Sequence, residues 1–123
     1  ISNRLIMISA CYSGVFVPSL QSEASVIITA ASRERNSFGC NPSNDWTFFG
    51  DALINTHLRS PTKLEAAVDK AFAMILGWEN ERGLVASDPQ KFFGEKAPLW
   101  LDKLELRRPA AASAKTGKPA NAP

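Results

Sequence analysis

The stretch Leu5–Gly14, which reads LIMISACYSG, decides the fold that we expect. Its first four residues are bulky and apolar without alternation, a pattern typical of a strand buried on both faces in a parallel sheet. We therefore predict a strand over Arg4–Ser9. Small residues and a glycine come next, so the chain turns directly after this strand. Cys11 is thus expected at the carboxyl end of the strand, in the crevice where open α/β sheets bind ligands.

A second run of β-branched residues predicts another strand, over Ser25–Ala30. We expect the two strands to be parallel neighbours. The connection through residues 12–25 should hold no more than a short turn of helix, because Pro18 interrupts a longer one. Residues 32–45 are rich in Ser, Asn, Arg, Gly and Pro, so they are expected to form a loop beside Cys11.

The remaining chain is expected to be mainly helical. Apolar residues at helical spacing predict a helix over about 46–58 and a longer one over about 60–80, which Gly83 would terminate. Residues 84–97 are expected to be irregular, and residues 98–104 to form a short last helix. The buried stripe of the long helix is predicted to consist of Leu64, Val68, Phe72, Ile75 and Leu76.

Four short motifs follow one another along the chain. They are Ala-Cys-Tyr-Ser-Gly at 10–14, Thr-Ala-Ala at 29–31, Ser-Phe-Gly-Cys at 37–40 and Thr-Phe-Phe-Gly-Asp at 47–51. In this order and at this spacing they resemble the legumain-type cysteine peptidases of the caspase clan, especially the bacterial branch. The resemblance covers about residues 4–58 well. It implies an α/β fold of the caspase-like kind, with a mostly parallel sheet flanked by helices.

The resemblance assigns a catalytic role to Cys11, which matches the nucleophile of the family's Cys-His dyad. A thiolate attacks a peptide carbonyl far better than a thiol, so this cysteine needs a base within hydrogen-bond reach. The backbone N–H groups of the turn at Tyr12 and Gly14 are candidates for binding the oxyanion. The alternative for Cys11 is a small buried apolar side chain.

Four further positions are expected to bind substrate. Asn36, Ser37 and Asp51 match family positions that help to shape the pocket for the residue before the cut bond. Ser9 stands where the family often has an acidic residue, two positions before the cysteine, so specificity for asparagine stays open. The alternative for Asp51 is a favourable interaction with the dipole of the predicted helix around it.

The sequence has one histidine, His57. The family's catalytic histidine comes before the cysteine, in a His-Gly pair, so His57 is not expected to be the base. We therefore expect residues 1–108 to be the C-terminal part of a caspase-like peptidase domain that lacks its N-terminal strands. Residues 109–123 hold no large apolar side chain and are expected to be disordered. Such a fragment should be inactive by itself.

The net charge and the residue composition indicate which binding partners to expect. The net charge of +2 gives no case for nucleic acid, and no apolar run approaches the ~18 residues of a membrane span. One histidine and two cysteines offer no metal site, and we expect no cofactor. The resemblance implies peptide or protein substrates and allows membrane association of the full-length parent. It favours the bacterial periplasm or cell envelope and leaves the oligomeric state open.

Other functions stay open beside a cysteine-type endopeptidase. An acyl-thioester passed to an amine rather than to water would make the protein a transamidase. The fold could instead serve as a non-catalytic binding module, because the dyad is incomplete in this chain. Cys11 and Cys40 could also pair as a disulfide, which would suit a thiol redox protein.

Overall fold

Three strands form one sheet in the order β1-β2-β3. The computed structural model describes residues 3–106, where the strands are β1 (Arg4–Ile8), β2 (Ser25–Thr29) and β3 (Gln90–Phe93). β1 and β2 run parallel, whereas β2 and β3 run antiparallel. The predicted parallel pairing of the first two strands is confirmed, although each strand ends slightly earlier than predicted.

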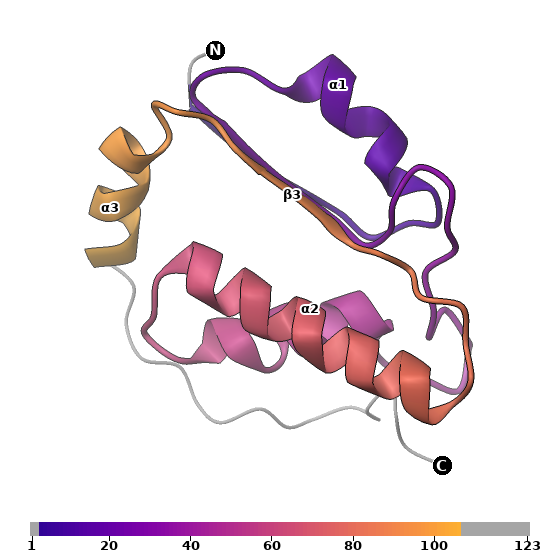
Figure 1. Ribbon diagram of the computed structural model, residues 1–123. Helices are drawn as coiled ribbons and strands as arrows, with labels where there is room; N and C mark the ends of the chain where they lie inside the picture. Colours follow the sequence, from indigo (N-terminus) through magenta and orange to yellow (C-terminus); the bar gives the residue numbers. More distant parts are fainter. Residues whose placement is uncertain (1–2, 107–123) are drawn as a thin grey trace.

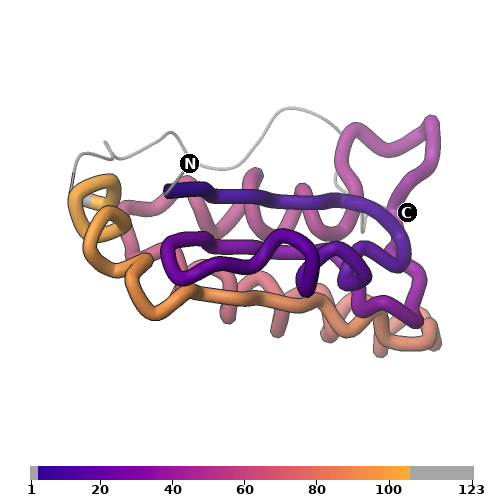
Figure 2. The backbone as a smooth tube through the Cα atoms, turned by 90° about the horizontal axis from the view of Figure 1, so that it is seen from above, coloured from indigo at the N-terminus to yellow at the C-terminus, as the bar shows by residue number. Residues whose placement is uncertain are grey.

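Helices cover both faces of this sheet, which confirms the α/β class (Figure 1). The long helix α2 (Leu64–Glu81) lies across one face. The short turn η1 (Ser13–Phe16) leads into α1 (Val17–Leu20), which covers the other face. Viewed from above, the three strands lie side by side with α2 running along them (Figure 2). Since only one of the two strand pairs is parallel, the sheet is mixed rather than mostly parallel.

β2 is the centre of the core, because it has strands on both edges and helices over both faces. All five of its residues are buried. Val26 and Ile28 belong to the hydrophobic cluster under α2, together with Val68 and Ile75 of that helix. Alternation along the strand directs Ile27 to the opposite face. The unalternating apolar pattern therefore predicts β2 correctly, and fits β1 less well, where Leu5 is 39% exposed.

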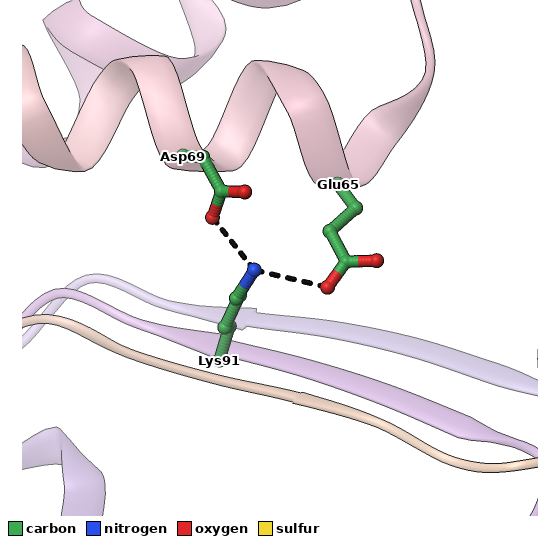
Figure 3. Close-up of polar contacts among 3 residues, drawn as sticks. All are labelled: Glu65, Asp69 and Lys91. Atoms are coloured by element: carbon green, nitrogen blue, oxygen red, sulfur yellow. Dashed lines mark hydrogen bonds and ion pairs between the residues drawn. The ribbon is translucent and has the colours of Figure 1, made fainter.

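Lys91 joins β3 to α2 (Figure 3). Its Nζ lies 2.9 Å from Glu65 Oε2 and 2.6 Å from Asp69 Oδ1. Burial lowers the pKa of Lys91, but the hydrogen bonds and charges of Asp69 and Glu65 outweigh that effect and raise the pKa above its ordinary value of 10.5. One ammonium thus bridges two carboxylates that lie a helical turn apart.

The prediction that residues 84–97 are irregular is wrong, because they contain β3. Its two phenylalanines favour a strand, but the strand has only four residues, and so short a run gives little local signal. Its extended conformation follows from pairing with β2, where Lys91 lies opposite Ile28 and Phe93 opposite Val26.

The predicted helix over 46–58 is confirmed only in part, because the helical residues 48–54 and 57–59 do not form one regular α-helix. The structure has instead a π-helical turn, η2 (Gly50–Ile54), and a 3-10 turn, η3 (His57–Arg59). The wide turn is closed by the N–H of Asn55, which donates to the carbonyl of Gly50. These residues have helical spacing but too few successive turns to form a regular α-helix.

The long helix begins later than predicted and ends as predicted. Its first residue is Leu64, whose N–H donates to the Glu105 carboxylate. At its end, Gly83 has a φ of 64°, and its N–H donates to the carbonyl of Asn80. Leu76 belongs to the predicted buried stripe but is 46% exposed, so this part of the prediction is wrong.

The last helix is α3 (Pro98–Leu106), which confirms the short helix predicted over 98–104. Its Trp100 donates an indole N–H to the carbonyl of Ala24 at 2.9 Å, which ties the helix to the start of β2. The tail predicted over 109–123 lies outside the described residues. Within the described part of the chain, no helix combines the length and apolarity that a bilayer crossing requires.

Candidate active site

Cys11 lies in the turn that follows β1, as predicted, and its thiol is exposed and free. The N–H of Ser37 donates to its Sγ at 3.3 Å. The sulfur also lies 3.6 Å from the carbonyl oxygen and 3.7 Å from the hydroxyl of the same serine. The predicted contact between Cys11 and the loop at 32–45 is therefore confirmed. An N–H directed at sulfur suits a thiolate, because it places positive charge next to the anion.

The turn after Cys11 is fastened to the chain that leaves β2. The N–H of Tyr12 donates to the carbonyl of Arg35 at 2.8 Å, and the N–H of Gly14 donates to the carbonyl of Ala31 at 2.8 Å. A Cβ added at Gly14 would lie 2.7 Å from the backbone nitrogen of Arg33. Only glycine therefore allows the two segments to approach this closely.

These hydrogen bonds argue against the N–H groups of Tyr12 and Gly14 as the donors that bind the oxyanion. Because the Tyr12 and Gly14 amides already donate to backbone carbonyls, they are not free to bind a substrate oxygen in this arrangement. Within residues 3–106, the N–H of Cys11 donates to no protein acceptor. It is therefore not engaged in the way that the Tyr12 and Gly14 amides are.

Tyr12 has an unusual backbone conformation, with a φ of 58° and a ψ of 16°. For a residue with a side chain, the left-handed region costs on the order of 1 kcal/mol. Such residues gather at functional sites, where the surrounding structure holds them in place. Here the hydrogen bond to Arg35 holds the residue that directly follows the thiol.

Ser9 connects the end of β1 to a third segment, which contains Thr47. Its hydroxyl lies 3.2 Å from the hydroxyl of Thr47, which also accepts the N–H of Gly50 at 3.0 Å. Asn36 is exposed in the loop, next to Ser37. The structure thus places three of the four predicted substrate-binding residues around the turn that holds the thiol.

Asp51 is placed differently from the other predicted residues. It lies in η2, is 4% exposed, and accepts a hydrogen bond from the Asn55 side chain at 2.9 Å. Arg59 donates to the backbone and side-chain oxygens of Asn55 at 3.0 and 3.2 Å. Asp51 is therefore part of a buried polar network within its own segment, and its carboxylate is already engaged by Asn55.

Cys40 and His57 are not joined to Cys11. Cys40 is an exposed free thiol, so the two cysteines form no disulfide in this structure. η3, which begins with His57, packs mainly against α2 and η2, and its Leu58 lines a small pocket with Leu5 and Met7 of β1. Burial, and to a smaller extent the charge of Lys70, lower the pKa of His57 below its ordinary value of 6.5.

Two features of this end of the molecule were missed by sequence reasoning. Thr47 was treated only as part of a motif, although it bonds both Ser9 and the start of η2. Glu79 is 1% exposed, and its Oε2 accepts the N–H of Ser87 at 3.1 Å. A signal for Glu79 exists, because it follows Ile75 by one helical turn and so continues the buried stripe of α2.

A comparison with known protein families gives a match. The family model described as the peptidase C13 family matches residues 1–89. This range is more than half of the 123 residues and includes Cys11, the loop that contacts it and α2. No curated protein and no solved structure matches the chain. Since the family is one of cysteine peptidases that act on peptides or proteins, the expected resemblance is confirmed, and the chain belongs to the peptidase C13 family.

Proposed function

We propose that this chain carries the nucleophile of a cysteine-type endopeptidase, and that the nucleophile is Cys11. The observation that carries the proposal is the exposed thiol after β1, with the Ser37 N–H directed at its sulfur at 3.3 Å. The chain belongs to a family of cysteine peptidases. We also propose that the sheet is the C-terminal part of a caspase-like fold.

In this mechanism the Cys11 sulfur attacks the carbonyl carbon of the peptide bond, and a C–S bond forms. The carbonyl oxygen becomes an oxyanion, which the N–H of Cys11 binds. The C–N bond then breaks, and the leaving amine takes the proton that the base removed from the thiol. Water hydrolyses the thioester, which releases the acid and restores the thiol.

The base is proposed to be a histidine that the 123-residue sequence does not contain. His57 is the one histidine of the sequence, and it lies in η3 against α2 and η2. Its pKa is lowered, so the imidazole is neutral near pH 7, but no described hydrogen bond joins it to Cys11, as a base for this thiol would need. The chain alone should therefore be inactive.

The substrate pocket is proposed to lie between the Cys11 turn and the loop. Ser37 contacts the sulfur, Asn36 is exposed beside it, and Ser9 closes the side next to Thr47. These groups are neutral hydrogen-bonding groups, so they suit a polar uncharged side chain before the cut bond. Asp51 is buried and its carboxylate is engaged by Asn55 of its own segment, which speaks against the direct substrate contact that the resemblance implies.

The test compares Cys11→Ala with Cys40→Ala in the full-length parent, using a panel of fluorogenic peptides. Cys11→Ala should lower kcat/KM by roughly three orders of magnitude or more, because the members of a catalytic unit act together. Cys40→Ala should keep activity, since this exposed thiol makes no described contact with Cys11. Full activity in Cys11→Ala would overturn the assignment. Cleavage by the 123-residue chain at the parent's rate would overturn the need for an outside base.

A further inference from the structure

A second pocket lies between α2 and the segment that leads into β3, and it has a volume of about 430 Å³. Most of its wall is apolar, and these lining residues are Phe72, Ala73, Leu76, Ala86 and Pro89. Three charged residues complete it, namely Arg35, Glu79 and Asp88. Apart from Arg35, none of them belongs to the segments that surround Cys11.

Glu79 is the residue that makes this pocket a candidate binding site. Its side chain is 1% exposed, and only one of its two carboxylate oxygens has a partner. Oε2 accepts the N–H of Ser87, whereas Oε1 is buried without a hydrogen bond. The Ser87 hydroxyl is likewise buried and unpartnered. A buried carboxylate oxygen is costly when it accepts no donor, and of these two residues Glu79 lines the pocket, so its Oε1 calls for a donor there.

The charge and shape of the pocket indicate what that ligand is. Two carboxylates, from Glu79 and Asp88, face one guanidinium, from Arg35, so the balance of charge favours a cation. The side chains of Phe72 and Leu76 offer contact to an apolar stem. A guanidinium pairs best with both oxygens of a carboxylate, but Oε2 is already used by Ser87. An ammonium needs only one oxygen as its anchor and has three donors.

We propose that this pocket binds an alkylammonium group, either the side chain of a lysine in a peptide or a free alkylamine. The ammonium donates to Glu79 Oε1, and the alkyl stem lies against Phe72 and Leu76. The proposal does not depend on Cys11 being a nucleophile. The site is nevertheless connected to the thiol, because the Arg35 carbonyl holds the N–H of Tyr12.

The test is a titration of the 123-residue chain with n-butylamine, followed by backbone amide chemical shifts in NMR spectra. Saturable shifts in residues of the pocket are expected. Butan-1-ol, which has the same stem without the charge, and methylamine, which has the charge without the stem, should each bind at least about tenfold more weakly. Equal binding of butan-1-ol would overturn the proposal.

Matched variants assign the interaction to one carboxylate. Glu79→Gln keeps an oxygen for the Ser87 N–H but removes the charge, and it should weaken n-butylamine binding at least about tenfold. Glu81→Gln is the control, since this acid is exposed on the same helix. Unchanged affinity in Glu79→Gln, or an equal loss in Glu81→Gln, would overturn the proposal.

A further variant keeps the test decisive if Glu79→Gln folds poorly. Ala73→Leu leaves the carboxylate intact and places a larger side chain in the pocket wall. It lies at an exposed helical position, where leucine is well tolerated, so the fold should persist by circular dichroism. Binding of n-butylamine should be lost in this variant, and retained affinity would contradict the proposed location.

The source of the ammonium is distinguished by a second titration, with Nα-acetyl-lysine amide. Competition between this compound and n-butylamine would support the lysine of a peptide as occupant. Binding of n-butylamine alone would support a free alkylamine. If neither compound binds with saturation, the proposal is overturned.

Discussion

At the residue scale, the Cys11 turn depends on a close approach of two backbone segments. Gly14 permits this approach, since the space that a side chain would need is taken by the backbone of Ser32 and Arg33. Tyr12 takes a left-handed conformation that its own preferences oppose. The position of the thiol therefore follows from neighbours that are distant in sequence, and the turn could not hold it alone.

Gly14→Ala should destabilise the protein by about 1–3 kcal/mol, because the new methyl group meets backbone atoms that cannot turn aside. A Cβ at this position would lie 2.7 Å from Arg33 N and 2.9 Å from Ser32 C. Urea unfolding measures the loss of stability. The rate at which iodoacetamide alkylates Cys11 should also change in this variant.

The control is Gly77→Ala, in the middle of α2, where an added Cβ meets nothing within 4 Å. This substitution should stabilise the helix by about 0.5–1 kcal/mol. A Gly14→Ala variant as stable as the wild type would show that the turn and the loop can separate without loss.

At the scale of elements, α2 and β3 stabilise each other across the sheet. β3 gains its partner from β2, and Lys91 connects it to Glu65 and Asp69 of α2. The C-terminal end of α2 is held by Glu79, which accepts the N–H of Ser87 in the segment before β3. These three polar contacts connect the helix to the chain around the strand, while apolar packing supplies most of the stability.

Lys91→Met should lower the free energy of unfolding by no more than about 1 kcal/mol, because exposed ion pairs contribute little in water. The side chain of Lys91 is 32% exposed, and those of Glu65 and Asp69 are 54% and 58% exposed. Urea unfolding at low and high salt measures the change, and the difference from wild type should shrink as salt rises.

Lys96→Met serves as the comparison, because Lys96 has a single exposed partner, Glu23, at 3.0 Å. Its effect should be smaller than that of Lys91→Met. A loss above about 2 kcal/mol in Lys91→Met would mean that the bridged ammonium is far less screened than its exposure indicates.

At the scale of the whole molecule, helices on opposite faces leave the carboxyl ends of β1 and β2 open at one end of the sheet. The Cys11 turn follows one strand and the loop at 32–45 follows the other, so parallel pairing brings them together. Parallel strands with helices on both faces commonly place binding residues this way. His57 lies in η3, which packs mainly against α2 and η2.

Stability should fall as the solution becomes acidic, in part through His57. Burial and Lys70 lower its pKa below 6.5 in the folded state, so the unfolded chain binds the proton more readily. The contribution is fully present above the unfolded pKa of about 6.5 and is lost as pH falls through the folded value.

Urea unfolding of wild type and His57→Gln at several pH values between about 8 and about 5 measures this contribution. The decline with falling pH should be shallower in His57→Gln. Lys70→Gln should also reduce the decline, by a smaller amount, since burial is the larger cause. Identical pH profiles for wild type and His57→Gln would show that the imidazole titrates alike in the folded and unfolded states.

The sequence by itself determined the features that depend on a local pattern. The strands β1 and β2 were predicted from their apolar runs, and the end of α2 was predicted from Gly83. Neighbouring residues specify each of these features. The place of Cys11 followed, because the apolar run stops and small residues come next, which marks the end of the strand. The four motifs also predicted the family, which the family match confirms.

Only the tertiary structure decided the features that depend on residues far apart in the chain. β3 has little strand signal and is extended because β2 offers it hydrogen bonds. The Tyr12 amide is engaged because the Arg35 carbonyl reaches it, and the Glu79 carboxylate is buried because Ser87 meets it there. Hydrogen-bond partners separated by many residues leave no periodic trace in the sequence, because the chain must first fold to bring them within about 3 Å of each other.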